Sequence, residues 1–186
     1  MMRRQVLAAV RVLLVFTVLL GVLYPLAVTG AARLAMPGRA GGSLVRWGDQ
    51  VVGSSLLCQQ FPGPEWFHGR PDACDPGASG PVNLGPSSEG LARAVDRALA
   101  AVQAAETASG LIPADAVSGG GSGLDPHISP EYARLQAPRV AVARGLSEDE
   151  VLELVERLTE GRTLGFLGEP RVNVLLLNLA LLDLQA

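Results

Sequence analysis

A run of 21 residues without a charged side chain, at positions 12–32, constrains this chain more than any other feature of its sequence. Arg11 and Arg33 bound the run on either side. At about 1.5 Å per residue, a helix of this length reaches roughly 31 Å, which matches the ~30 Å hydrocarbon core of a bilayer. The run therefore predicts a transmembrane helix at residues 12–32, preceded by a short tail at residues 1–11.

The small residues within this run favour contact with a second helix, because they let two backbones approach closely. Gly21 and Pro25 are tolerated in a membrane helix, since neighbouring groups satisfy the backbone atoms that they free. We expect a partner to contact the following residues of the helix: Leu20, Gly21, Tyr24, Pro25, Thr29 and Gly30.

A cleaved signal peptide is the competing interpretation of the same run. The apolar part of a signal peptide has only about 7–15 residues, so the length favours a retained anchor, although small residues at 29–32 leave cleavage open. Arginines do not settle the orientation by the positive-inside rule, since three precede the run and three follow it closely: Arg3, Arg4 and Arg11, then Arg33, Arg39 and Arg46.

The charges exclude several classes of function. Residues 34–186 carry 11 Arg and all 18 acids, a balance of 11 − 18 = −7, which argues against nucleic acid as a partner. All 15 basic residues are Arg, so neither a phosphate-binding loop ending in Gly-Lys nor the Asp-Lys-Thr-Gly phosphorylation motif of P-type ATPases can occur. The chain is therefore not the catalytic subunit of such a pump.

Patterns of apolar and turn residues predict a mixed domain at residues 43–186, after a Pro- and Gly-rich linker at 33–42. We expect one or two short strands within 43–61 around a Gly48-Asp49 turn, and a long loop over 62–90. A helix capped by Ser87 or Ser88 should run to about residue 108, and residues 111–117 should form a strand.

The C-terminal part of the sequence predicts three helices. Ser129 and Pro130 should start one, which Pro138 should kink or interrupt. Ser147 and the acids after it form a capping box for another helix, which Gly161 should stop. The apolar residues 170–184 indicate a buried helix, in which Asn173 and Asn178 would need hydrogen-bond partners.

No residue set predicts a catalytic or metal site. The chain has only two His, lacks a G-x-S-x-G motif, and its acidic run at 148–153 is typical of a solvated helix face. Cys58 and Cys74 cannot form a four-ligand zinc site without both distant His. They could form a disulfide worth roughly 3 kcal/mol in an oxidising compartment, or remain unpaired, and the sequence leaves both open.

Two loops are candidate binding segments, each with two interpretations. The Gly-rich residues 117–125 could form an anion-binding nest, or a tight turn that presents Asp125 and His127 to the start of a helix. Residues 66–71, which include His68 and Arg70, could be a docking patch, since Trp and Arg are enriched in interface hot spots. Alternatively, this loop packs its aromatic residues onto the core.

Several of these segments together resemble the C subunit of Kdp-type potassium-transporting P-type ATPases. The resemblance rests on residues 24–30 (YPLAVTG), 67–71 (FHGRP), 83–87 (NLGPS), 121–129 (GSGLDPHIS), 136–140 (QAPRV), 172–175 (VNVL) and 177–181 (LNLAL). It covers nearly the whole chain, and the fourth segment is highly specific. Pro81-Val82, Gly119-Gly120 and the two cysteines depart from the family pattern.

The resemblance implies an α+β chain: one transmembrane helix followed by a single compact mixed α/β domain outside the cytoplasm of a bacterial cell, with a cytoplasmic N-terminus. It implies a non-catalytic subunit of a high-affinity, ATP-driven potassium uptake complex in the inner membrane. The partners would be a channel-like potassium-binding subunit, a P-type ATPase subunit and a small single-helix subunit, which this chain would help to hold together. His68, Arg70, Asp125 and His127 would belong to the partner interface.

The family is also labelled ATP-binding, with the suggested nucleotide segment at Ser118, Gly119, Gly120, Gly121, Gln136 and Arg139. If the domain lies outside the cytoplasm, however, cytoplasmic ATP cannot reach these residues, because one helix crosses the bilayer only once. We therefore expect no cofactor bound directly by this chain, with ATP and potassium used by the complex. The alternative function is a membrane-anchored extracytoplasmic module that binds cations or another solute.

Overall fold

The computed structural model of the chain describes residues 2–71, 74–81, 83–106 and 110–184. The chain forms two units, Met1–Leu44 and Val45–Ala186, called here the helical unit and the mixed unit. One N-terminal apolar helix followed by a mixed α/β remainder confirms that part of the predicted fold class. The boundary between the units lies two residues beyond the end of the predicted linker at 33–42.

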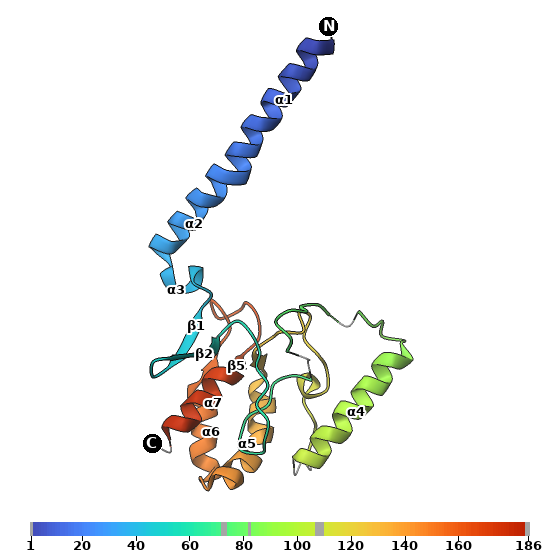
Figure 1. Cartoon of the computed structure of the whole chain (residues 1–186). Coiled ribbons are helices and arrows are strands. Elements are labelled where there is room, and N and C mark those ends of the chain that lie inside the picture. The colour runs from blue at the N-terminus through green and yellow to red at the C-terminus, as the bar shows by residue number, and fades with distance from the viewer. Residues whose placement is uncertain (1, 72–73, 82, 107–109, 185–186) are drawn as a thin grey trace. The chain divides into compact units, whose positions relative to one another are not determined.

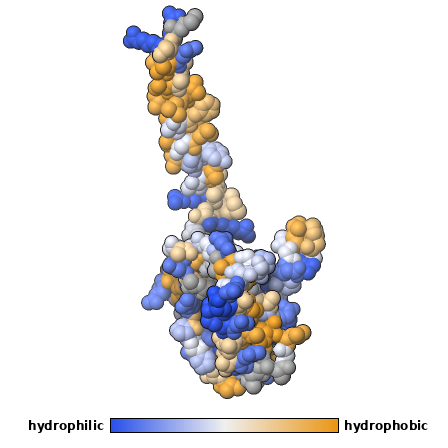
Figure 2. All heavy atoms as spheres, turned by 90° about the vertical axis from the view of Figure 1, so that its right-hand side faces the viewer, coloured by the Kyte–Doolittle hydropathy of each residue, from blue (hydrophilic) through white to orange (hydrophobic). Residues whose placement is uncertain are grey.

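The helical unit contains one continuous helical stretch from Met2 to Ala35, long and apolar enough to cross a membrane (Figure 1). It consists of α1 (Met2–Val18), the π-helical turn η1 (Leu19–Leu23) and α2 (Tyr24–Ala35), followed by the short α3 (Pro37–Ala40). The helix therefore extends beyond the predicted residues 12–32 at both ends. None of its side chains is buried, and most of its surface is hydrophobic (Figure 2).

Pro25 accounts for the π-helical turn. Proline has no N–H, so the residue four positions before it loses its usual hydrogen-bond donor, and the proline ring crowds that carbonyl. The chain responds by widening one turn: the N–H of Tyr24 donates to the carbonyl of Leu19, five residues back. The helix thus passes through Gly21 and Pro25 without a break.

The predicted hairpin is present as β1 (Leu44–Trp47) and β2 (Gln50–Ser54), and all of it but Leu44 belongs to the mixed unit. Gly48 has a φ of +58° in the connecting two-residue turn, a conformation that glycine adopts without steric cost. No helix or strand lies between residues 55 and 88 in the described part of the chain, as predicted for the long loop. A disulfide joins Cys58 to Cys74 within it.

A second, three-stranded antiparallel sheet has the order β3-β5-β4. Its strands are β3 (His127–Ile128), β5 (Arg171–Asn173) and β4 (Thr159–Glu160). His127 pairs with Asn173, and Thr159 pairs with Val172, which is fully buried. The sheet thereby places His127, which follows the Gly-rich loop, beside the start of the C-terminal helix.

Three helices pack together to form the main core: α5 (Pro130–Arg144), α6 (Glu148–Arg157) and α7 (Val174–Asp183). Their starts confirm the predicted caps, since Ser129 accepts from the N–H of Tyr132 and Ser147 forms a capping box with Glu150. Pro138 lies inside α5 and does not interrupt it. Its neighbours Ala137 and Val140 are fully buried, and this packing holds the helix together.

α4 (Glu89–Ala105) follows the long loop and is capped by Ser88, whose hydroxyl accepts from the N–H of Gly90. The backbone of Glu106 is extended, so the helix ends before the predicted residue 108, which itself lies outside the described residues. Val102 is the buried residue of this helix.

Three sequence predictions in this unit are wrong. Residues 111–117 contain a 3-10 turn, η2 (Ala114–Ala116), instead of a strand, because the carboxylate of Asp115 folds back onto Ser129. α6 ends at Arg157 and not at Gly161, since residues 159 and 160 pair with β5. The apolar tail is a helix only from Val174, because residues 171–173 form the central strand and Asn173 caps the helix.

Candidate partner-binding site

Two buried amide side chains hold segment 64–68 against the core. The Oε1 atom of Gln136 accepts from the N–H of His68 at 2.7 Å, and its Nε2 atom donates to the carbonyl of the same residue at 3.0 Å. Asn178 does the same to Phe67, at 2.8 Å and 2.9 Å. Both amides are fully buried, so their polar atoms and this loop backbone satisfy each other.

Arg139, which lies on α5, also bonds to the backbone of segment 64–68. Its guanidinium donates to the carbonyls of Pro64 and Trp66, to Oε1 of Gln136 at 2.9 Å and to Oε1 of Glu106 at 2.9 Å. The side chain of Glu106 is only 3% exposed, so the ion pair is buried. These side chains, together with that of His68, are called here the inner cluster: Gln136, Asn178, Arg139, Glu106 and His68.

The ring of His68 completes the inner cluster. Its Nε2 atom lies 3.0 Å from the carbonyl oxygen of Gly63, and a carbonyl only accepts, so this nitrogen carries a hydrogen. Burial lowers the pKa of His68, and the positive charge of Arg139 lowers it further. The neutral imidazole is therefore the form that suits this position.

The aromatic residues of segment 66–71 pack onto the domain. Phe67 is fully buried, and the guanidinium of Arg144 lies 4.3 Å from the centre of the Trp66 ring. The ring of Phe61 lies beside that of Trp66, with the ring centres 5.7 Å apart and the ring planes tilted by 40°. The structure thus agrees with the second interpretation of this loop, while contact of His68 with a partner stays a prediction.

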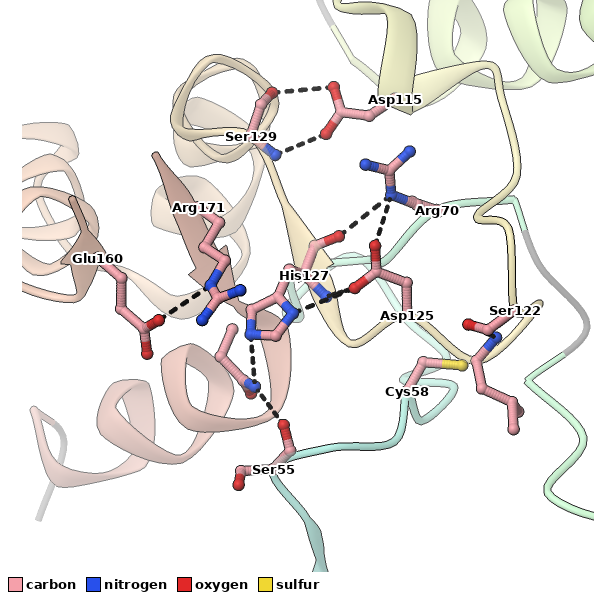
Figure 3. A network of polar contacts seen from close by, with 12 residues as sticks. Ser55, Cys58, Arg70, Asp115, Ser122, Asp125, His127, Ser129, Glu160 and Arg171 are labelled. Atoms are coloured by element: carbon pink, nitrogen blue, oxygen red, sulfur yellow. Dashed lines mark hydrogen bonds and ion pairs between the residues drawn. The ribbon is translucent and has the colours of Figure 1, made fainter. Parts of the chain in front are cut away.

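A second polar cluster lies where the Gly-rich loop meets β3 (Figure 3). The Oδ1 atom of Asp125 accepts from the backbone N–H of His127 at 3.0 Å and lies 3.1 Å from Nδ1 of its ring. The Nε atom of Arg70 lies 3.4 Å from Oδ2 of Asp125 and donates to the carbonyl of His127. The structure therefore brings together three of the predicted interface residues, called here the outer cluster.

The hydrogen bonds within the outer cluster favour the charged form of Asp125. The bond from the His127 side chain is the main cause that lowers the pKa of Asp125, and Arg70 adds to it. Since a carboxylate only accepts, Nδ1 of His127 carries a hydrogen, which leaves Nε2 facing the amide nitrogen of Asn173 at 3.5 Å. The side chains of Arg70 and Asp125 remain 26% and 33% exposed.

The outer cluster borders a hollow of about 470 Å³. Charged side chains from distant parts of the sequence share this hollow: Arg70, Asp115, Asp125, Glu169 and Arg171. It offers both hydrogen-bond donors and acceptors to whatever lies against it. Sequence reasoning missed Asp115 and Arg171 because their places depend on the pairing of β3 with β5 and on the cap of α5.

The Gly-rich loop is a turn tied to the long loop. The N–H of Gly80 donates to the carbonyl of Ser122, the N–H of Gly123 donates to that of Gly120, and Gly123 has a φ of +67°. The hydroxyl of Ser118 donates to the carbonyl of Ala114. This geometry agrees with the predicted turn that presents Asp125 and His127.

The residues of the family-suggested nucleotide segment lie in two separate parts of the mixed unit: residues 118–121 in one, Gln136 and Arg139 in the other. Residues 118–121 line a hollow of about 300 Å³ together with residues of α4. Gln136 and Arg139 instead bond to segment 64–68 and line no part of that hollow. The amide of Gln136 has no exposed surface, so this pair does not fit direct contact with a nucleotide.

The predicted interface residues of the helix lie in the helical unit: Leu20, Gly21, Tyr24, Pro25, Thr29 and Gly30. All six are exposed, and a Cβ atom added at either glycine would meet nothing within 4 Å. Among the described residues, no group of three or more His, Cys, Asp or Glu side chains is arranged to hold a metal ion.

Comparison with known proteins gives one family. Residues 6–183 match the family described as "KdpC: K+-transporting ATPase, c chain". A "Potassium-transporting ATPase KdpC subunit" from Kineococcus radiotolerans is 55% identical over 183 residues, which cover 96% of this chain and 93% of the relative. Relatives of the same name are 54% identical in Caulobacter vibrioides (89% and 86% covered) and 50% identical in Mycobacterium bovis (97% and 98% covered).

Proposed function

Because the chain belongs to the KdpC family of potassium-transporting ATPase subunits, we propose that it is the non-catalytic subunit that holds this complex together in the bacterial cell membrane. Its partners would be the channel-like potassium-binding subunit, the P-type ATPase subunit and the small single-helix subunit. The observation that carries the proposal is the apolar helix Met2–Ala35, none of whose side chains is buried. Lipid can cover such a surface, and the small residues within it would let a partner helix approach closely.

The length of this helix supports a single membrane crossing. Its 34 residues would reach about 51 Å, more than the ~30 Å of the hydrocarbon core. Both ends therefore extend into the polar interfaces, where Arg4 and Arg33 keep their charges in water. We infer that the N-terminus is cytoplasmic and that the mixed unit is extracytoplasmic, where an oxidising compartment suits the disulfide between Cys58 and Cys74.

The inner cluster supports a structural rather than a nucleotide-binding role. Gln136 and Arg139 use their donors and acceptors on segment 64–68 and on Glu106. Any effect of this chain on ATP use by the complex would then pass through helix contacts and shifted conformational populations. The outer cluster, which keeps exposed charged groups around a hollow, is the better candidate for partner contact.

The first experiment tests assembly. The tagged full chain, expressed with the other subunits and purified in mild detergent, should recover the complex, and potassium-stimulated ATP hydrolysis should require it. Gly21→Leu and Gly30→Leu should reduce this recovery, because a larger side chain separates the helices, whereas Leu14→Ile outside the predicted contact should not. Full recovery with both glycine variants would contradict the proposed helix contact.

The second experiment tests orientation and uses the absence of Lys from the chain. Arg157→Lys places one amine on the exposed surface of α6, and Arg4→Lys places one at the start of the helix. A membrane-impermeant amine reagent should label the first variant in intact cells. It should label the second variant, and the α-amino group of the unaltered chain, only after the membrane is broken. The reverse pattern would overturn the proposed orientation.

A further inference from the structure

Two different ties hold the part of the long loop that carries Arg70. Near the middle of this loop, the inner cluster binds the backbone of segment 64–68. At its ends, Cys58 and Cys74 are joined by the disulfide. Arg70 lies between the two ties, two residues after the segment that the inner cluster binds and four residues before Cys74. The position of Arg70 is therefore set from both sides.

Cys58 is bonded to the turn that leads into the outer cluster (Figure 3). Its N–H donates to the carbonyl of Leu124 at 3.0 Å, and its Sγ atom lies 3.8 Å from the carbonyl oxygen of Gly123. Leu124 directly precedes Asp125, the carboxylate that pairs with Arg70. The disulfide therefore links the backbone beside Asp125 to the loop segment that carries Arg70.

Cys74, at the other end of the disulfide, adopts a backbone conformation that its residue type rarely occupies. Its φ is +49°, in the left-handed region that residues with a Cβ atom generally avoid. Such a conformation persists where the surrounding structure holds the residue in it. The bond to Cys58 is a covalent restraint of this kind. When that bond is broken, Cys74 can return to a more common conformation, and Arg70 loses its second tie.

The ion pair of the outer cluster is too exposed to hold this loop by itself. The side chains of Arg70 and Asp125 are 26% and 33% exposed, and their closest charged atoms are 3.4 Å apart. Water screens such a pair, so it contributes little to stability. The inner cluster is buried, and its bonds to the loop run to residues 63–68, away from both cysteines. Breaking the disulfide should therefore release the outer cluster and leave the inner cluster in place.

We infer that the disulfide is a redox switch for the outer cluster: only the oxidised chain holds Arg70 against Asp125 and so presents the surface that another Kdp subunit contacts. This inference rests on the proposed function. The chain is synthesised with two thiols, which exchange with the disulfide of a thiol oxidant outside the cytoplasm. The bond between Cys58 and Cys74 forms, and the oxidant takes up their two electrons and two protons and becomes a dithiol. The switch thus delays partner contact until the mixed unit has crossed the membrane.

Backbone hydrogen exchange of the full chain in detergent, with and without a reductant, tests the switch directly. On reduction, the N–H groups of Cys58 and His127, which bond to Leu124 and Asp125, should exchange at least about tenfold faster. The N–H groups of segment 67–68, which the inner cluster binds, are the internal control and should change less than about twofold. Equal acceleration in both places, or none at Cys58 and His127, would overturn the inference.

Recovery of the complex tests the consequence for assembly. In the double variant Cys58→Ala, Cys74→Ala the binding-competent arrangement becomes a minor population, so recovery should fall at least about tenfold. Leu154→Ala removes a buried side chain from α6 but keeps the disulfide, so it controls for general loss of stability and should lower recovery less than about twofold.

The outcomes of this measurement separate the switch from the proposed function. Full recovery with the double variant, or an equal loss with Leu154→Ala, would overturn the switch and leave the proposed function standing. If the unaltered, oxidised chain recovers no Kdp subunit, the proposed function itself fails.

Discussion

The inner and outer clusters contain similar side chains but use them in opposite ways. In the inner cluster, Gln136, Asn178 and Arg139 turn inward and satisfy the backbone of segment 64–68. In the outer cluster, Arg70 and Asp125 bond to each other and to His127 but keep a quarter to a third of their surface exposed at a hollow. Both lie in segments that a sequence motif would mark as functional.

Burial and bonding to the protein's own backbone separate structural from interacting polar residues in this chain. A buried amide whose oxygen and nitrogen are both hydrogen-bonded within the protein has little to offer a ligand, and its removal leaves other buried groups unpaired. A half-exposed ion pair contributes little to stability because water screens it, but it remains available to a partner. The two clusters should therefore respond differently to substitution.

The largest expected effect is on the inner cluster. Gln136→Met keeps the size of the side chain but removes hydrogen bonds to His68 and Arg139, so the free energy of unfolding should fall by about 3–5 kcal/mol. Urea unfolding followed by tryptophan fluorescence measures this loss. Arg134, which lies on α5 like Gln136 and forms an exposed pair with Glu156 on α6, gives the control: Arg134→Gln should cost less than about 1 kcal/mol. If both variants lost the same free energy of unfolding, burial would not separate structural polar groups from the others.

The disulfide should have the next largest effect, because it closes the segment that carries parts of both clusters. The two cysteines are 16 residues apart, and a loop of this size is worth roughly 3 kcal/mol. The double variant Cys58→Ala, Cys74→Ala should lose about this free energy of unfolding. A reductant added to the unaltered chain should reproduce the loss, and failure to do so would point to damaged packing instead.

Asp125 in the outer cluster should affect stability much less. Asp125→Asn removes the charge that pairs with Arg70 but keeps an oxygen that accepts from the N–H of His127, so we expect a loss of about 1 kcal/mol. Recovery of the complex should fall more clearly than stability does. A loss as large as that of Gln136→Met would mean that the outer cluster is also structural.

The pH dependence of stability separates the clusters by their titrating groups and is the smallest effect. The folded state lowers the pKa of His68 below 6.5, so the unfolded chain binds more protons and stability should fall as the pH drops below about 6.5. The lowered pKa of Asp125 acts only below its ordinary 3.8, where stability is lost as the carboxylate becomes protonated.

His68→Gln tests this assignment, because the glutamine amide can still donate to the carbonyl of Gly63 but does not titrate. Unfolding measured at pH 7.5 and pH 5.5 should show a smaller change for the variant than for the unaltered chain. An identical change in both would assign the acid sensitivity to other groups.

Sequence reasoning succeeded where structure depends on neighbouring residues. Ser88, Ser129 and Ser147 cap the helices that follow them, and the Gly48-Asp49 turn joins two strands, because these are local backbone preferences. It failed at the three-stranded sheet, whose strands are two or three residues long and exist only because residues 128 and 159 both pair with residue 172. Strands of two or three residues are too short to show the alternation of apolar and polar residues by which a strand is recognised in a sequence.

The candidate site shows the same limit. The sequence indicates that Asn178 needs a partner, but not that the partner is the backbone of Phe67. It marks Gln136 and Arg139 as a motif, but only the folded chain gives their exposure and their bonds. The sequence also leaves the pairing of the two cysteines open, because pairing depends on how the long loop folds back.

The bonds of Asn173 and Asn178 have a consequence for the order of events during synthesis. Asn178 reaches back 111 positions to Phe67, and Asn173 reaches back 118 positions to Ser55. Residues 55–68 therefore leave the ribosome long before the side chains that secure them exist. Closing contacts so distant along the chain is slow, so this loop should stay exposed to proteases and chaperones until α7 has been made.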